Sequence, residues 1–383
     1  MDAETRMPDV VELTKALIAA ESVTPARGAV FDVLEAALIP LGFSVERFIE
    51  GEAPDGPVEN LLAVRVGAGE EGGPHFAFAG HLDVVPPGAG WTSGPFTPEI
   101  RDGLLHGRGA VDMKGAIAAF VAASARTTGS GTISLIITGD EEGPATFGTR
   151  ALIERMADRG LKPDFCLVGE PTSAQRLGDM IKIGRRGSVN IWIDVPGRQG
   201  HVAYPQLADN PIPKLVAILA EIDAIVLDEG TDWFQPSNIE ATDITVGNPA
   251  TNVIPAHASA RLSIRYNDLH TGDALAARIE AIVHRHAPDA TMIARVSGDA
   301  FVTAPGALST LIGDAIEARL GIRPELSTTG GTSDARFLSK LCPVVEFGLI
   351  NATMHKLDEA VAIADLEALT GVYEEVLRRV FTS

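Results

Sequence analysis

Cysteine is scarce in this chain, and the cysteines it has argue against disulfide bonds. Cys166 and Cys342 are the two cysteines among 383 residues, and each lies inside a short apolar run. Domains that are stabilised by disulfide bonds have many more cysteines at closer spacing. We therefore expect both thiols to be reduced and buried.

Basic residues and long apolar stretches are also in short supply. Lys and Arg number 31 against 51 Asp and Glu, which gives a formal net charge of −20. Such a surface repels the phosphates of nucleic acids and of anionic lipids. The apolar stretches 116–123 and 215–220 are among the longest, and both fall short of the ~20 residues that a membrane-spanning helix needs. Residues 1–10 lack the basic and apolar segments of a secretory signal. We expect a cytoplasmic protein without nucleic-acid or membrane partners.

Three common catalytic signatures are missing as well. The chain has no P-loop lysine motif, no G-x-S-x-G turn and no H-E-x-x-H helix. The corresponding nucleotide-binding, serine-hydrolase and zincin mechanisms therefore have no support in the sequence.

The first part of the chain contains short apolar strands that alternate with helices. Strands are predicted at 61–66, 75–79, 132–138 and 165–168, and helices at 10–18, 113–125 and 148–159. This alternation is typical of an α/β domain with a largely parallel, buried sheet.

The pattern changes near residue 184. A strand at 188–195, a helix at 212–225, strands at 239–246 and 258–266 and a helix at 274–286 form a self-contained β-α-β-β-α unit. A strand at 344–347 and a helix at 365–380 then follow. We predict a discontinuous α/β domain, residues 1–183 and 300–383, into which an α+β domain, residues 184–299, is inserted.

Imidazole and carboxylate side chains follow several of the predicted strands. His81 and Asp83 come after the apolar run 76–80, Glu141 and Glu142 after 132–138, and Glu170 after 165–168. His355 follows the strand at 344–347, and Asp112 lies in a glycine-containing loop. Ligands of open α/β sheets gather beyond the carboxyl ends of the strands, so we expect these side chains to converge. Their mixture of imidazole and carboxylate suits divalent cations.

His201 is singled out among the remaining histidines. It lies in the polar, glycine-containing segment 197–205, directly after a predicted strand, and an ordinary surface loop is the alternative interpretation.

The sequence at these residues resembles the dinuclear zinc metallopeptidases of the aminoacylase and carboxypeptidase G type. The resemblance covers nearly the whole chain and is carried by the motifs Gly80–Pro86, Gly107–Gly115, Gly139–Gly143, Gly169–Pro171 and Met354–Lys356. It implies two zinc ions per subunit, with cobalt as a substitute at one site. One ion would bind His81 and Glu170 and the other Glu142 and His355, with Asp112 bridging both.

The same resemblance implies roles for three further residues. Asp83 would hold the His81 ring. Glu141 would act as the general base that takes a proton from water and delivers it to the leaving amine. The inserted domain would mediate dimerisation, and His201 would act in the active site of the other subunit of a homodimer, where it stabilises the oxyanion.

A second group of motifs resembles one branch of this family, which releases succinate from N-succinyl-LL-2,6-diaminopimelate. These motifs lie at 184–188, 200–205, 252–255, 330–336 and 351–355. Arg185, Arg265 and Arg336 are candidates to hold the carboxylates of this substrate. Five further residues are candidates for hydrogen bonds to it, namely Ser188, Tyr204, Asn252, Thr332 and Asn351.

Two other interpretations remain open at this point. An acetylornithine deacetylase or a carboxypeptidase would share the zinc site and differ in the pocket that binds the anionic groups. A binding protein stabilised by metal, with no catalytic activity, is the non-enzymatic alternative, and the presence of Glu141 argues against it.

Overall fold

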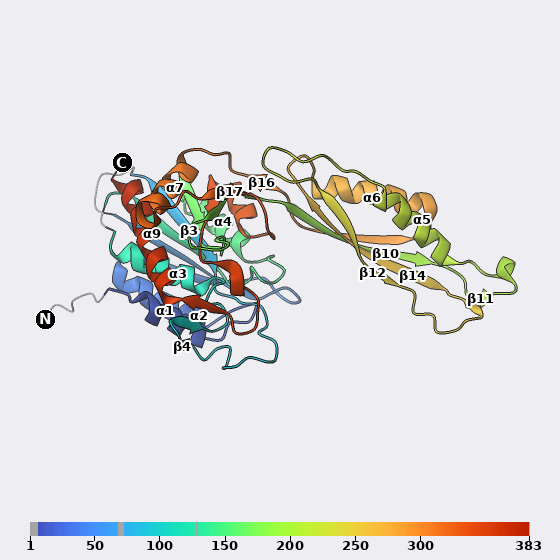
Figure 1. Ribbon diagram of the computed structural model, residues 1–383, viewed down its shortest axis with the longest axis horizontal. Coiled ribbons are helices and arrows are strands. Elements are labelled where there is room, and N and C mark those ends of the chain that lie inside the picture. Colours follow the sequence, from blue (N-terminus) through green and yellow to red (C-terminus); the bar gives the residue numbers. More distant parts are fainter. Residues whose placement is uncertain (1–6, 68–72, 128, 383) are drawn as a thin grey trace. The chain divides into compact units, whose positions relative to one another are not determined.

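The computed structural model describes residues 7–67, 73–127 and 129–382, and the chain divides into two compact units (Figure 1). Unit 1 contains Met1–Ile183, Thr303–Ser327 and Ser333–Ser383, and unit 2 contains Gly184–Val302 and Thr328–Thr332. Unit 2 thus extends past the predicted insertion and takes in a short segment that the sequence did not assign to it. Residues 1–6, part of the segment inspected for a secretory signal, lie outside the described residues.

Unit 1 is built on a mixed sheet of eight strands. Their order across the sheet is β1 (Ser44–Glu50), β2 (Val58–Val66), β6 (Thr132–Thr138), β3 (His75–His81), β7 (Phe165–Val168), β18 (Val344–Glu346), β8 (Met180–Lys182) and β17 (Glu325–Ser327). The central strands β6, β3, β7 and β18 run parallel to their neighbours in this series. Antiparallel pairing joins β1 to β2, β2 to β6, and β18 to β8. The carboxyl ends of the four central strands therefore lie along one edge of the sheet.

Helices and short elements complete unit 1. The helices are α1 (Val10–Ala19), α2 (Ala29–Leu38), α3 (Lys114–Ala125), α4 (Thr149–Asp158), α7 (Ala307–Leu320), α8 (Ala335–Leu338) and α9 (Ile363–Phe381), with 3₁₀ turns η1 (Ile39–Leu41) and η3 (Asn351–Thr353). A small sheet joins β4 (Glu99–Arg101), β5 (Leu104–His106) and β19 (Ala360–Ala362).

The core of unit 1 lies where α3 and α9 meet the sheet. Residues 114–124 of α3 are all buried, because every side chain after Lys114 in this stretch is apolar or small and the helix lies among other elements. The ring of Phe120 stacks on Phe78 of β3 at 4.2 Å between centroids, and Tyr373 of α9 meets both rings edge-on. The Tyr373 hydroxyl donates a hydrogen bond to the Phe347 carbonyl oxygen, just after β18. These contacts fix the end of β18 against the helices.

Unit 2 is a four-stranded antiparallel sheet with two helices on one face. The strand order is β12 (Asn238–Thr245), β14 (His257–Tyr266), β10 (Gly187–Pro196) and β15 (Thr291–Gly298). The helices α5 (Pro211–Asp223) and α6 (Gly272–His286) pack on the buried face of this sheet (Figure 1). Shorter elements are β9 (Gly184–Arg185), β11 (Gly200–His201), η2 (Pro205–Leu207), β13 (Val253–Ile254) and β16 (Phe301–Val302).

Several elements escaped prediction from the sequence. The predicted β-α-β-β-α pattern lacks β15, an edge strand of the sheet. Its residue Ile293 is apolar but lies on the outer face, where it is 60% exposed, so the sequence does not alternate between apolar and polar residues there. The helices α2 and α7 and the edge strand β1 were also missed.

Both cysteines are free and buried, as predicted. In the described part of the chain, no helix combines the length and apolar character needed to span a bilayer.

Asp228 organises the loop that leads from α5 to β12 in unit 2. Its carboxylate accepts hydrogen bonds from the main-chain nitrogen of Gly230, Asn267 Nδ2 and His270 Nε2 at 2.7–2.9 Å. Burial opposes its ionisation, but hydrogen bonds from Ser237 and these donors outweigh that effect and lower the pKa of Asp228 to about 2.

The Asp228 carboxylate should stabilise unit 2 in a pH-dependent way. Its folded-state pKa lies below the ordinary 3.8, so the stabilisation is complete above the ordinary pKa and is lost as the pH falls through about 2. Asp228→Asn should lower the melting temperature at pH 7, and the difference from the wild type should shrink at pH 3. Asp232→Asn, in the same loop and exposed, is the control. A difference that did not change with pH would contradict this role.

Candidate metal centre and active site

Five imidazole and carboxylate side chains meet at the carboxyl edge of the unit 1 sheet. His81 ends β3, Glu142 and Glu170 follow β6 and β7, Asp112 precedes α3, and His355 follows η3. His81 Nε2 lies 3.1 Å from Asp112 Oδ1 and 3.8 Å from Glu170 Oε1. His355 Nε2 lies 3.1 Å from Asp112 Oδ2 and 2.8 Å from Glu142 Oε1. The fold thus brings together the five residues selected from the sequence as metal ligands.

Asp112 lies at the middle of this cluster, with one carboxylate oxygen toward each imidazole. Burial opposes its ionisation, but hydrogen bonds from His355 and His81 lower the pKa of Asp112. Hydrogen bonds to Asp112 and Glu142 raise the pKa of His355 to about 10. Although burial disfavours a charged His81, Asp112 and the other carboxylates raise its pKa as well. The surrounding carboxylates therefore stabilise positive charge at both imidazoles.

The donor set fits divalent cations. Among the described residues, two groups of potential ligand atoms lie within 4.8 Å of one another. One is formed by His81, Asp112 and Glu142 and the other by His81, Glu141 and Glu170. Mixed imidazole and carboxylate donors are typical of zinc and related ions. The second group includes Glu141, which the resemblance assigns as the base, so proximity alone does not separate a base from a ligand here.

Glu141 lies in a strongly negative environment. Burial and the Glu170 carboxylate raise its pKa well above the ordinary 4.5, and Asp334 adds to this effect. Asp334 was not selected from the sequence, although it lies in the motif at 330–336. It is buried, and its Oδ2 accepts a hydrogen bond of 2.7 Å from Thr149 Oγ1. A carboxylate that holds a proton readily is suited to proton transfer near neutral pH.

Asp83 positions the turn that carries Glu141 and Glu142. Its carboxylate accepts hydrogen bonds from the main-chain nitrogens of Glu141 at 3.2 Å and Glu142 at 2.9 Å. Nδ1 of His81 lies 2.9 Å from the main-chain oxygen of Asp83 and 3.6 Å from its carboxylate. The expected contact with the His81 ring is thus made most closely by the main chain, because the side chain is engaged by the turn.

Glu359 holds the loop that presents Asp112, and the sequence analysis missed it. This fully buried carboxylate accepts hydrogen bonds from Arg108 Nη1 and from the main-chain nitrogens of Gly109, Val111 and Asp112 at 2.8–3.1 Å. Because Glu359 lies four residues after His355, it ties two parts of the cluster together. Its spacing from His355 is the one sequence signal that could have drawn attention to it.

Replacing Glu359 should weaken metal binding without removing a ligand. Glu359→Gln puts an amide donor among four donors, so the Asp112 loop should loosen and the affinity for divalent cations should fall roughly 10- to 100-fold. Calorimetric titration of the metal-free protein with Zn²⁺ measures this change. Glu375→Gln, which removes a buried carboxylate of α9 paired with Arg378 and Arg379, should leave the affinity unchanged. Equal affinities in wild type and Glu359→Gln would refute the role of Glu359.

Two of the predicted substrate contacts lie in unit 1. Arg336 is 8% exposed, with Nη1 donating to the Ser333 carbonyl oxygen at 3.2 Å and Nη2 lying 3.8 Å from Asp334 Oδ1. Its Nε has no hydrogen-bond partner among the described residues. Asn351 begins η3, in the segment that leads to His355.

The remaining predicted contacts lie in unit 2, where they form two separate groups. Near the start of β10, Arg265 Nη1 donates to Ser188 Oγ at 2.6 Å, and Arg185 Nη1 donates to the Gly331 carbonyl oxygen at 3.1 Å, next to Thr332. Beyond the end of β10, the pair β11–β13 carries an exposed group of side chains: His201, Tyr204 and Asn252. The ten residues of β10 separate the groups by about 30 Å.

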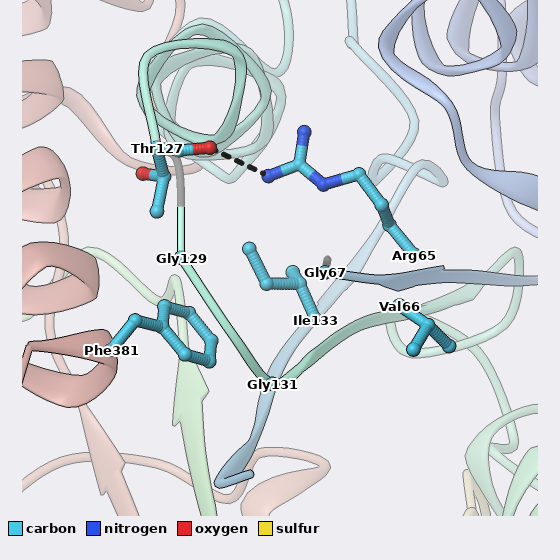
Figure 2. Close-up of a pocket in the computed structure, with 8 residues that line it drawn as sticks. All are labelled: Arg65, Val66, Gly67, Thr127, Gly129, Gly131, Ile133 and Phe381. Carbon is cyan, nitrogen blue, oxygen red and sulfur yellow. Dashed lines mark hydrogen bonds between the residues drawn. The ribbon is translucent and has the colours of Figure 1, made fainter. Parts of the chain in front are cut away.

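A hollow of about 320 Å³ lies elsewhere in unit 1, away from this cluster (Figure 2). It is lined by Arg65, Val66, Gly67, Thr127, Gly129, Gly131, Ile133 and Phe381. Val66 pairs with Thr132 at the start of β6, whereas the cluster lies past the end of that strand. Arg65 in its wall donates hydrogen bonds to the Ser124 and Thr127 carbonyl oxygens at the end of α3. The hollow holds none of the predicted site residues.

Solved structures share the fold of the chain at low sequence identity. A tripeptidase from Staphylococcus aureus aligns over 98% of this chain and 100% of its own, with a TM-score of 0.80 and 17% identity. Human carnosine dipeptidase 1 aligns over 98% and 96%, with a TM-score of 0.72 and 20% identity.

Relatives of known name are much closer in sequence. A protein of Sphingopyxis alaskensis named succinyl-diaminopimelate desuccinylase is 72% identical over 98% of this chain and 100% of its own length. The protein of the same name in Zymomonas mobilis subsp. mobilis is 56% identical over 98% and 99%. The model of peptidase family M20/M25/M40 matches residues 77–379. The chain therefore belongs to peptidase family M20/M25/M40.

Proposed function

We propose that this chain hydrolyses N-succinyl-LL-2,6-diaminopimelate to succinate and LL-2,6-diaminopimelate, a step in diaminopimelate and lysine biosynthesis. The cluster around Asp112, next to Glu141, carries the proposal that it is a metal-dependent amide hydrolase. The names of relatives that are 53–72% identical over nearly the full length support the succinyl substrate over acetylornithine or a peptide.

Two zinc ions per subunit are the proposed cofactors, with cobalt able to replace zinc at one site. His81 and Glu170 would hold one ion and Glu142 and His355 the other, with Asp112 shared, which follows the contacts described above. When bound, divalent cations of this kind polarise a carbonyl group and acidify water.

Glu141 is the proposed general base. It would take a proton from the attacking water and deliver it to the leaving amine, which keeps the carboxylate itself unchanged over a full cycle. Asp83 holds the main chain of Glu141 through its hydrogen bond, so it would keep the base in place. A neutral His201 would donate a hydrogen bond to the oxyanion that forms when water adds to the amide carbonyl.

The substrate has three carboxylates, which require local positive charge in a chain of net charge −20. Arg185, Arg265 and Arg336 are proposed to hold them. Hydrogen bonds are proposed from Ser188, Tyr204, Asn252, Thr332 and Asn351.

The proposed reaction can be tested with the purified enzyme and one variant. The zinc-loaded enzyme should release succinate from N-succinyl-LL-2,6-diaminopimelate faster than it releases acetate from acetylornithine, and a chelator should abolish both activities. Glu141→Gln should retain about two zinc ions per chain and lose roughly 10²- to 10⁴-fold in kcat, because proton transfer fails while coordination survives.

Metal analysis and succinate release from the same samples give the two readings. Loss of a zinc ion from Glu141→Gln would make Glu141 a ligand rather than the base. Faster release of acetate would favour a deacetylase, and no turnover by the zinc-loaded enzyme would favour a binding protein.

A homodimer is proposed because one copy of unit 2 presents its two groups of predicted contacts too far apart. Arg265 pairs with Ser188 near the start of β10, and His201 follows the end of that strand. The ten residues of β10 span about 30 Å, which exceeds the length of the proposed substrate. The exposed side chains Val216 of α5 and Ile244 of β12 border an apolar hollow of about 390 Å³, which suits burial against a second copy. We propose that His201, Tyr204 and Asn252 serve the active site of the partner subunit.

Mixing two inactive variants should restore activity if His201 acts across the dimer. In a heterodimer of Glu141→Gln and His201→Ala chains, one of the two sites has both an intact Glu141 and an intact partner His201. Succinate release should rise toward a quarter of the wild-type rate after subunit exchange, since half of the dimers are mixed. A mixture that stayed inactive despite exchange, verified with differently tagged chains, would place His201 in its own chain's site.

The two free thiols are compatible with a reducing compartment, and we propose a cytoplasmic location.

A further inference from the structure

Two arginines of unit 2 lie close together without a carboxylate between them. Arg186 directly precedes β10, and Arg265 of β14 pairs across the ladder with both Ser188 and Asn238. Arg186 Nη1 donates to Asn238 Oδ1 at 3.1 Å. Burial and the neighbouring charge of Arg265 lower the pKa of Arg186, so the two guanidinium groups are close enough to repel each other.

The hydrogen-bond partners of both guanidinium groups are neutral wherever the structure describes them. Arg265 Nη1 donates to Ser188 Oγ, Ser263 Oγ and the Ile264 carbonyl oxygen. Arg186 contacts the side-chain amides of Asn238 and Gln235, and its Nε is buried without a partner. Other arginines of this chain, such as Arg47 and Arg108, have carboxylates at 2.6–2.8 Å. Because the chain carries 20 excess negative charges, two adjacent arginines that share no carboxylate form a site prepared for an anion.

This pair lies on the face of the sheet that points away from α5 and α6. Val189 and Ile191 of β10 belong to the core under the helices, so the alternate residues Ser188 and Asn190 face the other side. Arg265, Asn238 and Glu240 share that side through their register with Ser188 and Ser263. A ligand on this face therefore meets side chains of three neighbouring strands.

A carboxylate completes the arrangement on the same face. Asn238 Nδ2 donates a hydrogen bond of 3.3 Å to Glu240 Oε1, and Glu240 is exposed. The face thus carries two cations, Arg186 and Arg265. It also carries an anion, Glu240, which lies two residues beyond Asn238 along β12. Such a combination complements a group that carries both a carboxylate and an ammonium, as a free amino-acid end does.

We propose that Arg186, Arg265 and Glu240 form a subsite for the free amino-acid end of the substrate, the end that is not acylated. This inference rests on the proposed function, because N-succinyl-LL-2,6-diaminopimelate has one end with both a free carboxylate and a free ammonium. Arg186 and Arg265 bind the carboxylate, and Glu240 with the Asn238 amide oxygen binds the ammonium. The succinyl end has no ammonium and gains nothing from Glu240.

Two substrate analogues isolate the two halves of this subsite. N²-Succinyl-L-lysine lacks only the distal carboxylate, and N-succinyl-L-2-aminopimelate lacks only the distal ammonium. Arg186→Gln should lower kcat/KM for the diaminopimelate substrate roughly 10- to 100-fold, mainly through KM, and should change kcat/KM for the succinyl-lysine less than about twofold.

Glu240→Gln gives the complementary result. It should raise KM for N-succinyl-LL-2,6-diaminopimelate and leave KM for the aminopimelate analogue unchanged. Arg261→Gln is the matched control, because Arg261 lies on the same strand and face and also has a neutral partner, Thr242. That control should not alter discrimination between the substrates.

The outcomes separate the subsite from the proposed function. Turnover of the succinyl substrate by the wild-type holoenzyme decides the function. If Arg186→Gln lowers kcat/KM equally for the diaminopimelate and lysine substrates, or for neither, the subsite assignment is wrong while the proposed function stands. Arg186→Lys, which keeps the charge, and the melting temperature of each variant distinguish loss of contact from loss of structure.

Discussion

The site depends on bringing several carboxylates into one small buried volume. Asp112 lies between His81 and His355, and Glu142 and Glu170 lie on the outer sides of the two imidazoles. Carboxylates that repel one another at this distance stay together only if positive charge is present among them or if their positions are imposed by the fold. The raised pKa values of His81 and His355 express the same requirement, since these imidazoles favour the charged form in this field. Divalent cations satisfy the requirement more fully, which is the physical basis of the proposed metal centre.

Two further carboxylates impose these positions through the main chain. Asp83 binds the nitrogens of Glu141 and Glu142, and Glu359 binds the nitrogens of Gly109, Val111 and Asp112. Hydrogen bonds from main-chain nitrogens stabilise a buried carboxylate and at the same time fix the path of the loop that supplies them. The ligand-bearing loops are therefore held by contacts that leave the ligand side chains themselves available.

Unit 2 contributes a different kind of constraint, which is the length of a strand. Arg186 and Arg265 lie at one end of β10, and His201 lies beyond the other. Because the strand is extended, the arginines at one end and His201 beyond the other cannot contact the same small molecule within one copy. The proposed dimer follows from this separation, because it assigns the distant group to the active site of a second copy.

The sequence by itself determined the α/β character of unit 1 and most of the long helices and strands of both units, and the family resemblance that it carries named the five clustered residues. The spacing of apolar residues and the position of a residue just after a strand are local properties, which neighbouring residues in the sequence reveal. The family motifs mark the same positions. The sequence did not reveal β15, where an edge strand has an apolar residue on each face, or α7, whose buried side includes Ser309 and Gly313 beside Leu308 and Ile312. Tertiary structure alone decided that Glu359 holds the Asp112 loop, that Asp83 uses its carboxylate for the Glu141–Glu142 turn, and that Arg186 stands beside Arg265. These are contacts between residues as far as 250 positions apart, and no local pattern records which donor a buried carboxylate will meet once the strands have paired.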